Sequence, residues 1–382
     1  MKITLLEPYF TGSHASWARE YAGCSRHQIE ILSLPGRHWK WRMHGGAVTL
    51  ARKFIDSSFH PDLLLATDML DLTTFLTLTR GKSAQCKTAL YFHENQLTYP
   101  WSPEDRDQAL NRDAHYAFIN YASALAADAV LFNSSYHFHS FIDELPRFLK
   151  SFPDKNELGT VEMIRQKCRV LHLGMDLRRF DPYRPAKIER GDGRPPLILW
   201  NHRWEYDKNP EEFFAVLERS AAAGLDFQVA ILGESFSDAP AIFREVRERM
   251  GNRVVRFGFV KSFADYAEWL WLADILPVTS RHDFFGASVV QAIYCNCYPL
   301  LPKRLAYPEH IPNEHHSRFF YEDTADLGVK LEGLLRNCGE ASRQPLTGFV
   351  DRYDWQRMAP EYDDFFERLV SDGTNSRGDS VA

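Results

Sequence analysis

The stretch SRHDFFGASVVQA, residues 280–292, gives a clear indication of the fold of this chain. A short apolar run before it is typical of a buried strand, and from Phe285 onward the apolar residues take a helical spacing. The segment predicts a strand, a loop that carries Asp283, and a helix that opens on Gly286, with Gln291 within that helix. A helix N-terminus presents free backbone N–H groups, which suit a phosphate. From these residues alone, a ligand-binding loop and an ordinary strand-to-helix connection are equally open.

Short apolar strands and helices alternate along the chain in two sets. The first set predicts strands at residues 2–7, 28–34, 62–66, 87–92, 129–132 and 168–172, and helices at residues 12–23, 46–58, 106–126 and 134–150. The second predicts strands at residues 197–200, 227–232, 254–257, 275–278 and 298–301, and helices at residues 210–223, 239–250 and 262–272 besides that of the opening stretch. Strands that alternate with helices of this length indicate parallel, doubly wound sheets. The expected fold class is therefore α/β, with two Rossmann-like units in tandem.

The domain boundaries follow from a segment rich in proline, glycine and charge, residues 182–196, which is typical of a linker. We expect an N-terminal Rossmann-like domain at residues 1–183 and a C-terminal one at residues 184–354. Residues 355–370 have a helical pattern, and we expect this helix to pack back towards the N-terminal domain. The polar residues 371–382 predict a disordered tail.

Composition limits the class of protein. The chain has 382 residues, of which 45% are hydrophobic and 25% charged, as in soluble globular proteins. No apolar run approaches the roughly 20 residues of a membrane span, and the N-terminus enters a strand pattern without the apolar region of a signal peptide. Six scattered cysteines in a chain with an ample core indicate no disulfide framework. We therefore expect reduced thiols and a cytoplasmic protein.

The net charge of −6 is unevenly distributed along the chain. Residues 1–190 carry 24 Lys and Arg against 21 Asp and Glu, a net charge of +3, whereas the remainder carries 21 against 30, a net charge of −9. Ten of the 15 histidines also lie in the first half. If a polyanion binds this chain, the first half is its expected binding surface.

Two polar clusters follow predicted strands of the first half, where ligands of open α/β sheets bind. Gly12, Ser13 and His14 come after the first strand, and the glycine either lets the backbone approach a ligand or only makes a tight turn. The residues HENQ, 93–96, follow another strand. His93 can orient or deprotonate a hydroxyl near neutral pH, and the alternative is a cluster that only stabilises its loop.

Two further stretches carry positive charge. Arg203 and Lys208 follow the strand at 197–200 and can clamp a diphosphate, although a solvated loop in which acidic neighbours pair with them is an equally good explanation. The residues RHWKWRMH, 37–44, interleave basic and aromatic side chains, which can meet phosphates and stack on bases. A loop that packs its tryptophans on the domain explains that stretch at least as well.

Together these segments resemble the GT-B glycosyltransferases of the retaining family 4. That family carries S-x-x-E-x-F-G followed by a second glutamate, and the matching positions here, with both glutamates replaced, are Ser280, Asp283, Phe285, Gly286 and Gln291. A narrower resemblance, to the tRNA-queuosine mannosyltransferase family, extends from the N-terminus to about Pro308. It rests on the strings LEPYFTGSH, LPGRHWKWR, YFHENQLTYP, LFNSSY, WNHRWEYDKNP and HDFFGASVVQAIYCNCYPL.

The resemblance implies a GT-B fold, with two Rossmann-like domains facing across a cleft, and retaining transfer of mannose from GDP-mannose to the queuosine base of a tRNA. The catalytic residues it implies are His93, Arg203, Lys208 and Asp283. The implied donor-binding residues are Gly12, Arg203, Lys208, Asp283, Phe285, Gly286 and Gln291. Acceptor-binding residues are expected to be Ser13, His14, Arg37, Trp39, Lys40, Trp41, Arg42, Glu94, Asn95 and Gln96.

The implied roles follow the chemistry of each side chain. Arg203 and Lys208 would stabilise the charge of the leaving diphosphate, so that no metal or cofactor besides the nucleotide sugar is expected. Asp283 would contact hydroxyls of the donor sugar, and Gln291 those of the ribose. The expected partners are a nucleotide sugar and a tRNA, with no membrane.

Two alternatives stay open. The same fold could act on a glycan, lipid or small-molecule acceptor, which the acidic overall charge favours. The chain could also be a catalytically silent nucleotide- or RNA-binding protein, which the replacement of both family glutamates favours.

Overall fold

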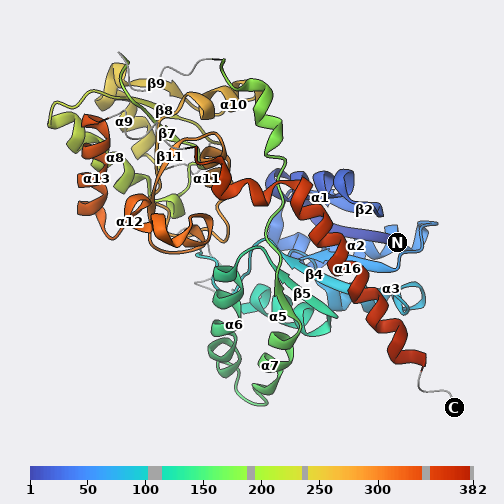
Figure 1. Cartoon of the computed structure of the whole chain (residues 1–382). Helices are drawn as coiled ribbons and strands as arrows, with labels where there is room; N and C mark the ends of the chain where they lie inside the picture. The colour runs from blue at the N-terminus through green and yellow to red at the C-terminus, as the bar shows by residue number, and fades with distance from the viewer. Residues whose placement is uncertain (102–113, 187–193, 235–239, 338–344, 379–382) are drawn as a thin grey trace. The chain divides into compact units, whose positions relative to one another are not determined.

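The computed structural model describes residues 1–101, 114–186, 194–234, 240–337 and 345–378 (Figure 1). The chain forms two compact units, of which one comprises Met1–Asp176 with Tyr353–Ala382 and the other comprises Leu177–Arg352. The first boundary precedes the expected linker, because the residues after Asp176 pack within the second unit. There Trp271 Nε1 donates a hydrogen bond to the Phe180 carbonyl at 2.8 Å.

The first unit is built on a six-stranded parallel sheet in the order β2-β1-β3-β4-β5-β6. Its strands are β1 (Lys2–Phe10), β2 (Gln28–Pro35), β3 (Leu63–Thr67), β4 (Lys87–Phe92), β5 (Ala129–Phe132) and β6 (Cys168–Val170). Every residue of β3 and β5 is buried, as a strand requires when helices cover both faces of a parallel sheet. This burial explains why both strands appear in the sequence as continuous apolar runs.

Helices connect the strands of the first unit: α1 (Gly12–Cys24), α2 (Trp39–Asp56), α3 (Leu72–Ser83), α5 (Ala114–Ala126), α6 (Ser135–Lys150) and α7 (Gly159–Gln166). Side-chain caps set two of their starts. The Asp71 carboxylate accepts a hydrogen bond from the Thr74 N–H at 3.0 Å, and the Ser134 hydroxyl accepts one from the His137 N–H at 3.0 Å. These caps satisfy backbone donors next to the loops that follow β3 and β5.

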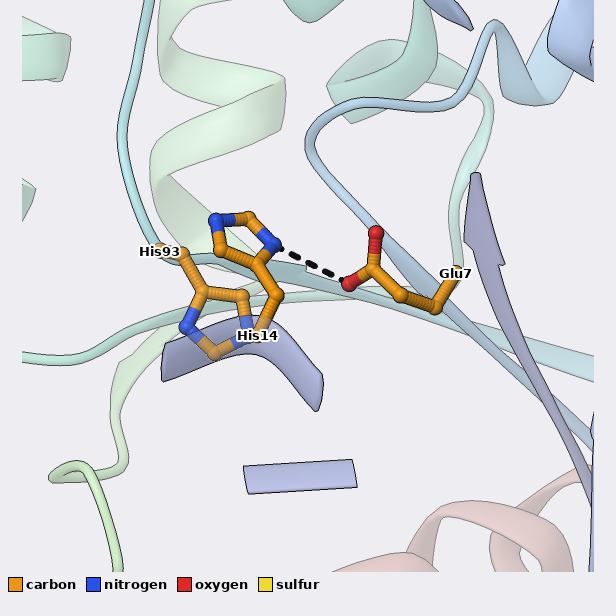
Figure 2. A group of neighbouring side chains, drawn as sticks. All are labelled: Glu7, His14 and His93. Atoms are coloured by element: carbon orange, nitrogen blue, oxygen red, sulfur yellow. Dashed lines mark hydrogen bonds and ion pairs between the residues drawn. The ribbon is translucent and has the colours of Figure 1, made fainter. Parts of the chain in front are cut away.

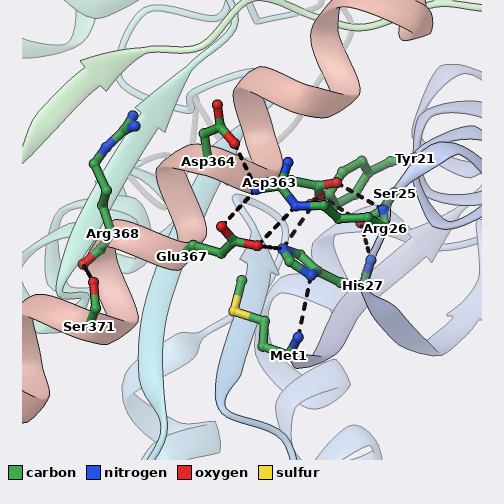
Figure 3. Close-up of polar contacts among 10 residues, drawn as sticks. All are labelled: Met1, Tyr21, Ser25, Arg26, His27, Asp363, Asp364, Glu367, Arg368 and Ser371. Atoms are coloured by element: carbon green, nitrogen blue, oxygen red, sulfur yellow. Dashed lines mark hydrogen bonds and ion pairs between the residues drawn. The ribbon is translucent and has the colours of Figure 1, made fainter.

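The last helix, α16 (Trp355–Gly378), packs within the first unit although it ends the chain. Figure 3 shows its polar anchor, in which the Asp363 carboxylate accepts hydrogen bonds from Tyr21 Oη at 2.8 Å, Ser25 Oγ at 2.6 Å and the Arg26 backbone N–H at 2.9 Å. Asp363 is only 2% exposed, so these three donors replace the water that a carboxylate otherwise needs.

The second unit contains another six-stranded parallel sheet, in the order β12-β11-β10-β7-β8-β9. Its strands are β7 (Leu197–Trp200), β8 (Gln228–Ile231), β9 (Val254–Phe257), β10 (Ile275–Pro277), β11 (Tyr298–Pro302) and β12 (Phe320–Tyr321). Its helices are α8 (Pro210–Ala222), α9 (Ile242–Met250), α10 (Phe263–Leu272), α11 (Ala287–Tyr294), α12 (His316–Phe319), α13 (Thr324–Arg336) and α15 (Thr347–Val350). This is the strand order of a Rossmann sheet, and it reverses between β7 and β10. The two parallel sheets confirm the expected α/β fold class.

The structure departs from the expected elements at several places. α2 begins at Trp39 instead of residue 46, because a buried helical face that includes Met43, Gly46 and Leu50 is continuous through the basic and aromatic stretch. The sequence patterns give no bounds for α3 and α7, and they leave out α12, β12, α13 and α15 altogether. α16 continues to Gly378, into the segment expected to be a disordered tail. The helix expected at 106–126, the linker and the tail fall partly outside the described residues.

Two expectations from composition can be checked on the described part of the chain. The described cysteines, Cys24, Cys86, Cys168, Cys295 and Cys297, are free thiols. None of the described helices combines the length and the apolar character that a bilayer crossing requires.

Candidate active site

In open α/β sheets, ligands bind beyond the carboxyl ends of the strands, where the strand order reverses. In the second unit this point lies after β7 and β10, and direct contacts join the loops that follow these strands. Thr279 Oγ1 lies 3.0 Å from the Lys208 carbonyl and 2.9 Å from the Asn209 carbonyl. The Arg281 N–H donates to the Asp207 carbonyl at 2.8 Å. The two predicted donor-binding stretches therefore form one site.

Lys208 is buried at the centre of this junction. Its Nζ donates a hydrogen bond to the His282 carbonyl at 2.8 Å and lies 3.1 Å from Asp207 Oδ2 and 3.4 Å from Asp283 Oδ2. Burial lowers the pKa of this amine, but the carboxylates of Asp283 and Asp207 outweigh burial and raise it. Lys208 is therefore charged, and its charge holds the two loops together. Its contact with a diphosphate stays a prediction.

Asp283 is held by one of its two carboxylate oxygens. Oδ2 lies beside Lys208 and accepts a hydrogen bond from Tyr307 Oη at 3.1 Å. Burial raises the pKa of this carboxyl, but the charge of Lys208 and the hydrogen bond from Tyr307 help to lower it below its usual value. The side chain is 19% exposed, and no described residue hydrogen-bonds to the other oxygen, Oδ1. Asp283 is thus an ionised carboxylate with one oxygen available to a ligand hydroxyl.

Two buried histidines, His202 and His282, flank Lys208, and neither is among the predicted site residues. Burial, followed by the charge of Lys208, lowers the pKa of both His202 and His282 to about 4. Both rings are therefore neutral near pH 7 and can form hydrogen bonds without adding charge to the site. His202 Nδ1 lies 3.1 Å from Ser288 Oγ in the first turn of α11. The only signal in the sequence was that each histidine directly precedes a predicted site residue.

Gly286 turns the loop into α11 with a φ of 85°, a conformation that favours glycine. A Cβ at this position would lie 2.9 Å from Tyr307 Cε1, so the close packing also requires glycine. The neighbouring Phe285 is 3% exposed, and its carbonyl accepts a hydrogen bond from His310 Nε2 at 2.6 Å. Phe285 thus anchors the loop through the core of the unit.

Arg203 and Gln291 are the remaining candidates of the second unit. The Arg203 side chain is 49% exposed and pairs with Glu205 Oε2 at 3.1 Å, as in the alternative that the sequence left open. An exposed guanidinium in this loop can still offer its N–H groups to a phosphate. Gln291 Oε1 accepts a hydrogen bond from Tyr266 Oη at 2.9 Å, which fixes its amide on α11. Their contacts with a donor stay predictions.

In the first unit the strand order reverses between β1 and β3. The predicted residues His14 and His93 meet there with Glu7, which was not predicted (Figure 2). His14 Nδ1 lies 3.0 Å from Glu7 Oε2, and the ring centroids of His14 and His93 are 4.3 Å apart. Burial lowers the pKa of His14, but the carboxylate of Glu7 outweighs burial and raises it to about 9. Burial, followed by the charges of His14 and His137, lowers the pKa of His93 well below its usual value. A charged and a neutral histidine therefore lie in contact.

Asp68 is a second carboxylate of this site and is not among the predicted site residues. It is 1% exposed, and its Oδ1 accepts a hydrogen bond from the His93 backbone N–H at 2.8 Å. Among the described residues, its Oδ2 has no hydrogen-bond partner. Burial raises the pKa of Asp68 well above its usual value, against the opposing charge of His14. Its position directly after a strand was the signal that could have identified it, whereas Glu7 lies within a strand and gave none.

The other residues of the HENQ stretch hold its loop. Asn95 is fully buried, and its Oδ1 accepts hydrogen bonds from the backbone N–H groups two and three residues later, at 3.1 and 3.0 Å. The Gln96 N–H donates to Asn120 Oδ1 at 2.8 Å, and its side chain donates to Glu94 Oε1 at 3.0 Å. The loop-stabilising alternative therefore describes Asn95 and Gln96, and their contact with an acceptor stays a prediction.

The basic and aromatic stretch at the start of α2 contains both packed and exposed members. The Trp39 ring packs on Trp101 with centroids 6.2 Å apart, and Lys40 Nζ lies 5.3 Å from the Trp101 ring. Arg42 Nε donates to the Pro35 carbonyl at 3.1 Å. The exposed members of the predicted acceptor-binding set are Ser13, Arg37 and Trp41.

One group among the described residues has the composition of a metal site. The possible ligand atoms of Glu7, His14 and His93 all lie within 4.8 Å of one another. The hydrogen bond between His14 Nδ1 and Glu7 Oε2 also accounts for the position of His14 as a carboxylate–imidazolium pair.

Comparisons with known proteins identify the family and the fold of the chain. A family model described as tRNA-queuosine alpha-mannosyltransferase N-terminal matches residues 2–175. A tRNA-queuosine alpha-mannosyltransferase of Drosophila melanogaster is 34% identical over 382 residues, 97% of each chain. A GDP-mannose-dependent alpha-(1-6)-phosphatidylinositol dimannoside mannosyltransferase of Mycobacterium tuberculosis is 24% identical over 73% of this chain and 67% of that one. Sucrose-phosphate synthase from Thermosynechococcus elongatus has a solved structure with a TM-score of 0.66 at 13% identity, covering 97% of this chain and 99% of that one. This structural likeness confirms the expected GT-B fold.

Proposed function

Because the chain belongs to the tRNA-queuosine alpha-mannosyltransferase family, we propose that it transfers mannose from GDP-mannose to the queuosine base of a tRNA with retention of configuration. The observation that carries this proposal is the 34% identity to the Drosophila melanogaster enzyme along 97% of both chains. A relationship of that extent covers both units, and hence both groups of candidate residues. A tRNA acceptor also makes the cytoplasm the expected location.

The relatives and the chemistry of the second unit both support GDP-mannose as the donor. The Mycobacterium tuberculosis relative is named as GDP-mannose-dependent. Arg203 presents an exposed guanidinium, and the buried charge of Lys208 lies beside the same loops. Both charges can stabilise a leaving diphosphate, and the ionised Asp283 can accept hydrogen bonds from sugar hydroxyls.

The reaction breaks the bond between the mannose anomeric carbon and the phosphate oxygen of GDP. A queuosine hydroxyl oxygen forms the new bond on the same face of the sugar, and its proton passes to the departing phosphate oxygen. His93, whose ring is neutral, can accept a hydrogen bond from a hydroxyl of the sugar or the acceptor. No protein nucleophile is required in this scheme.

The test is direct transfer. We expect the purified full chain, incubated with GDP-mannose and a queuosine-containing tRNA, to add one hexose to queuosine, measured by mass spectrometry of the digested nucleosides. The same tRNA isolated from cells without queuosine is the matched control and should stay unmodified. Absence of hexose on queuosine with GDP-mannose and with a panel of other nucleotide sugars would overturn the proposed function.

A further inference from the structure

A segment outside the predicted motifs, residues 304–310, holds the loop that carries Asp283. At one end, the Arg304 guanidinium donates hydrogen bonds to the Ser280 carbonyl from Nε at 3.2 Å and from Nη2 at 3.1 Å. At the other end, His310 Nε2 donates to the Phe285 carbonyl at 2.6 Å. The start and the end of the loop are thus tied to one short segment after β11.

Tyr307 stands between these two anchors and contacts the functional carboxylate itself. It is 0% exposed, and its Oη donates to Asp283 Oδ2 at 3.1 Å. Its ring packs so closely on Gly286 that a Cβ there would lie 2.9 Å from Tyr307 Cε1. Lys208 Nζ lies 3.4 Å from the same Oδ2 atom. Two donors therefore occupy Oδ2, and Oδ1 is the oxygen left for a ligand.

We infer that Tyr307 is a positioning residue for the donor sugar, which aims the Asp283 carboxylate so that Oδ1 accepts hydrogen bonds from sugar hydroxyls. This inference rests on the proposed function of the site. Aspartate stands here at a position where the wider family carries glutamate, and its shorter side chain brings the carboxylate less far into the site. Its orientation must then be set by neighbours that are themselves held rigidly, as Tyr307 is.

The variant that tests this role is Tyr307→Phe, which removes the donated hydrogen bond and keeps the ring against Gly286. We expect kcat/KM for GDP-mannose to fall about tenfold or more, the size of one lost hydrogen bond to a charged group. The affinity for GDP, which has no mannose, should be unchanged in calorimetry. Unchanged GDP affinity also shows that the variant is folded.

Tyr298→Phe is the matched control. Tyr298 is 4% exposed and its Oη donates to the Arg318 carbonyl at 3.2 Å in the same unit, away from the loop. We expect this variant to retain both the GDP affinity and the turnover of the wild-type chain. An equal loss in both variants would show that any buried tyrosine hydroxyl matters, and would overturn the inference.

A double-mutant cycle separates positioning from a direct role. If Tyr307 acts through Asp283, then adding Tyr307→Phe to Asp283→Asn should cost little further activity. Additive losses, or wild-type kinetics in Tyr307→Phe, would overturn the inference. The comparison of GDP-mannose and GDP affinities does not depend on turnover. The wild-type chain could bind GDP-mannose more tightly than GDP, lose this preference in Tyr307→Phe, and yet transfer no mannose. That result would overturn the proposed function and leave the positioning role of Tyr307 standing.

Discussion

The carboxylate of Glu7 makes folding depend on the protonation of His14. Burial opposes the charge on His14, but Glu7 raises its pKa from an ordinary 6.5 to about 9 in the folded chain. Because the folded chain binds this proton more tightly than the unfolded chain, the pair's stabilisation is complete below about pH 6.5 and is lost as the pH rises through about 9.

We therefore expect the free energy of unfolding to fall between pH 6 and pH 9.5 by up to about 3 kcal/mol, and Glu7→Gln to remove most of this fall. Urea unfolding at the two pH values measures it. Glu361→Gln, at an exposed glutamate of α16, is the control and should retain the fall. A slope in Glu7→Gln as steep as in the wild-type chain would show that other groups cause it.

Arg203 and Lys208 share one predicted role at the diphosphate, but their different burial predicts different effects of their replacement on stability. Arg203 is 49% exposed, so we expect Arg203→Ala to keep its stability and to lower kcat by roughly 10²–10³-fold through lost charge stabilisation. Lys208 is buried between two carboxylates, so Lys208→Ala should also destabilise the chain by about 3 kcal/mol. Steady-state kinetics and urea unfolding of both variants measure the difference. Equal stability of the two variants would argue against the buried role of Lys208.

At the scale of elements, the buried Asp363 carboxylate is one of the contacts that hold α16 within the first unit. Asp363 accepts three hydrogen bonds and is 2% exposed, so we expect Asp363→Ala to destabilise the chain by about 3 kcal/mol, since it leaves buried donors without an acceptor. Chemical denaturation measures this loss. The neighbouring Asp364, whose side chain is 53% exposed, is the matched control, and Asp364→Ala should cost far less. Equal losses would contradict the anchoring role of Asp363.

The element boundaries show what local patterns can and cannot reveal. The alternation of strands and helices predicted most elements of both sheets, because burial on both faces leaves continuous apolar runs. The start of α2 was placed too late, since the tryptophans and charges of its first turns obscured a helical face that continues to Met43. β12 has only two residues, Phe320–Tyr321, too few to make a pattern.

At the scale of the whole molecule, the positive excess of the first half predicts how tRNA binding should respond to salt. We expect that neutralising Arg37, Lys40 and Arg42 together weakens tRNA binding. The slope of the logarithm of the association constant against the logarithm of the salt concentration should fall in magnitude by up to about 2, because fewer phosphate contacts release fewer counterions on binding. Filter binding over a series of salt concentrations measures the slope.

Neutralising Arg52, Lys150 and Lys155 is the control, since these exposed residues also lie in the first unit and their replacement removes the same charge. A slope that changes equally in both triple variants would indicate that overall charge, and not the start of α2, governs tRNA binding.

Sequence by itself was sufficient for the fold class, for two tandem α/β units and for the loops that carry Asp283, Arg203 and His93. These features depend on local periodicity and on residues that follow strands, both of which are visible along the chain. The local pattern leaves the role of Asn95 open, because the same amide can contact a ligand or close its own loop. Its Oδ1 closes the loop, and its contact with an acceptor stays a prediction.

The tertiary structure alone decided which side chains work together and in which charge state. Glu7 reaches His14 from within a strand, Asp68 holds the backbone of His93 from the turn directly after β3, and Tyr307 holds Asp283 from a segment more than twenty residues away. A pKa or a carboxylate's orientation is set by neighbours a few ångströms distant in space, and no spacing along the sequence records them.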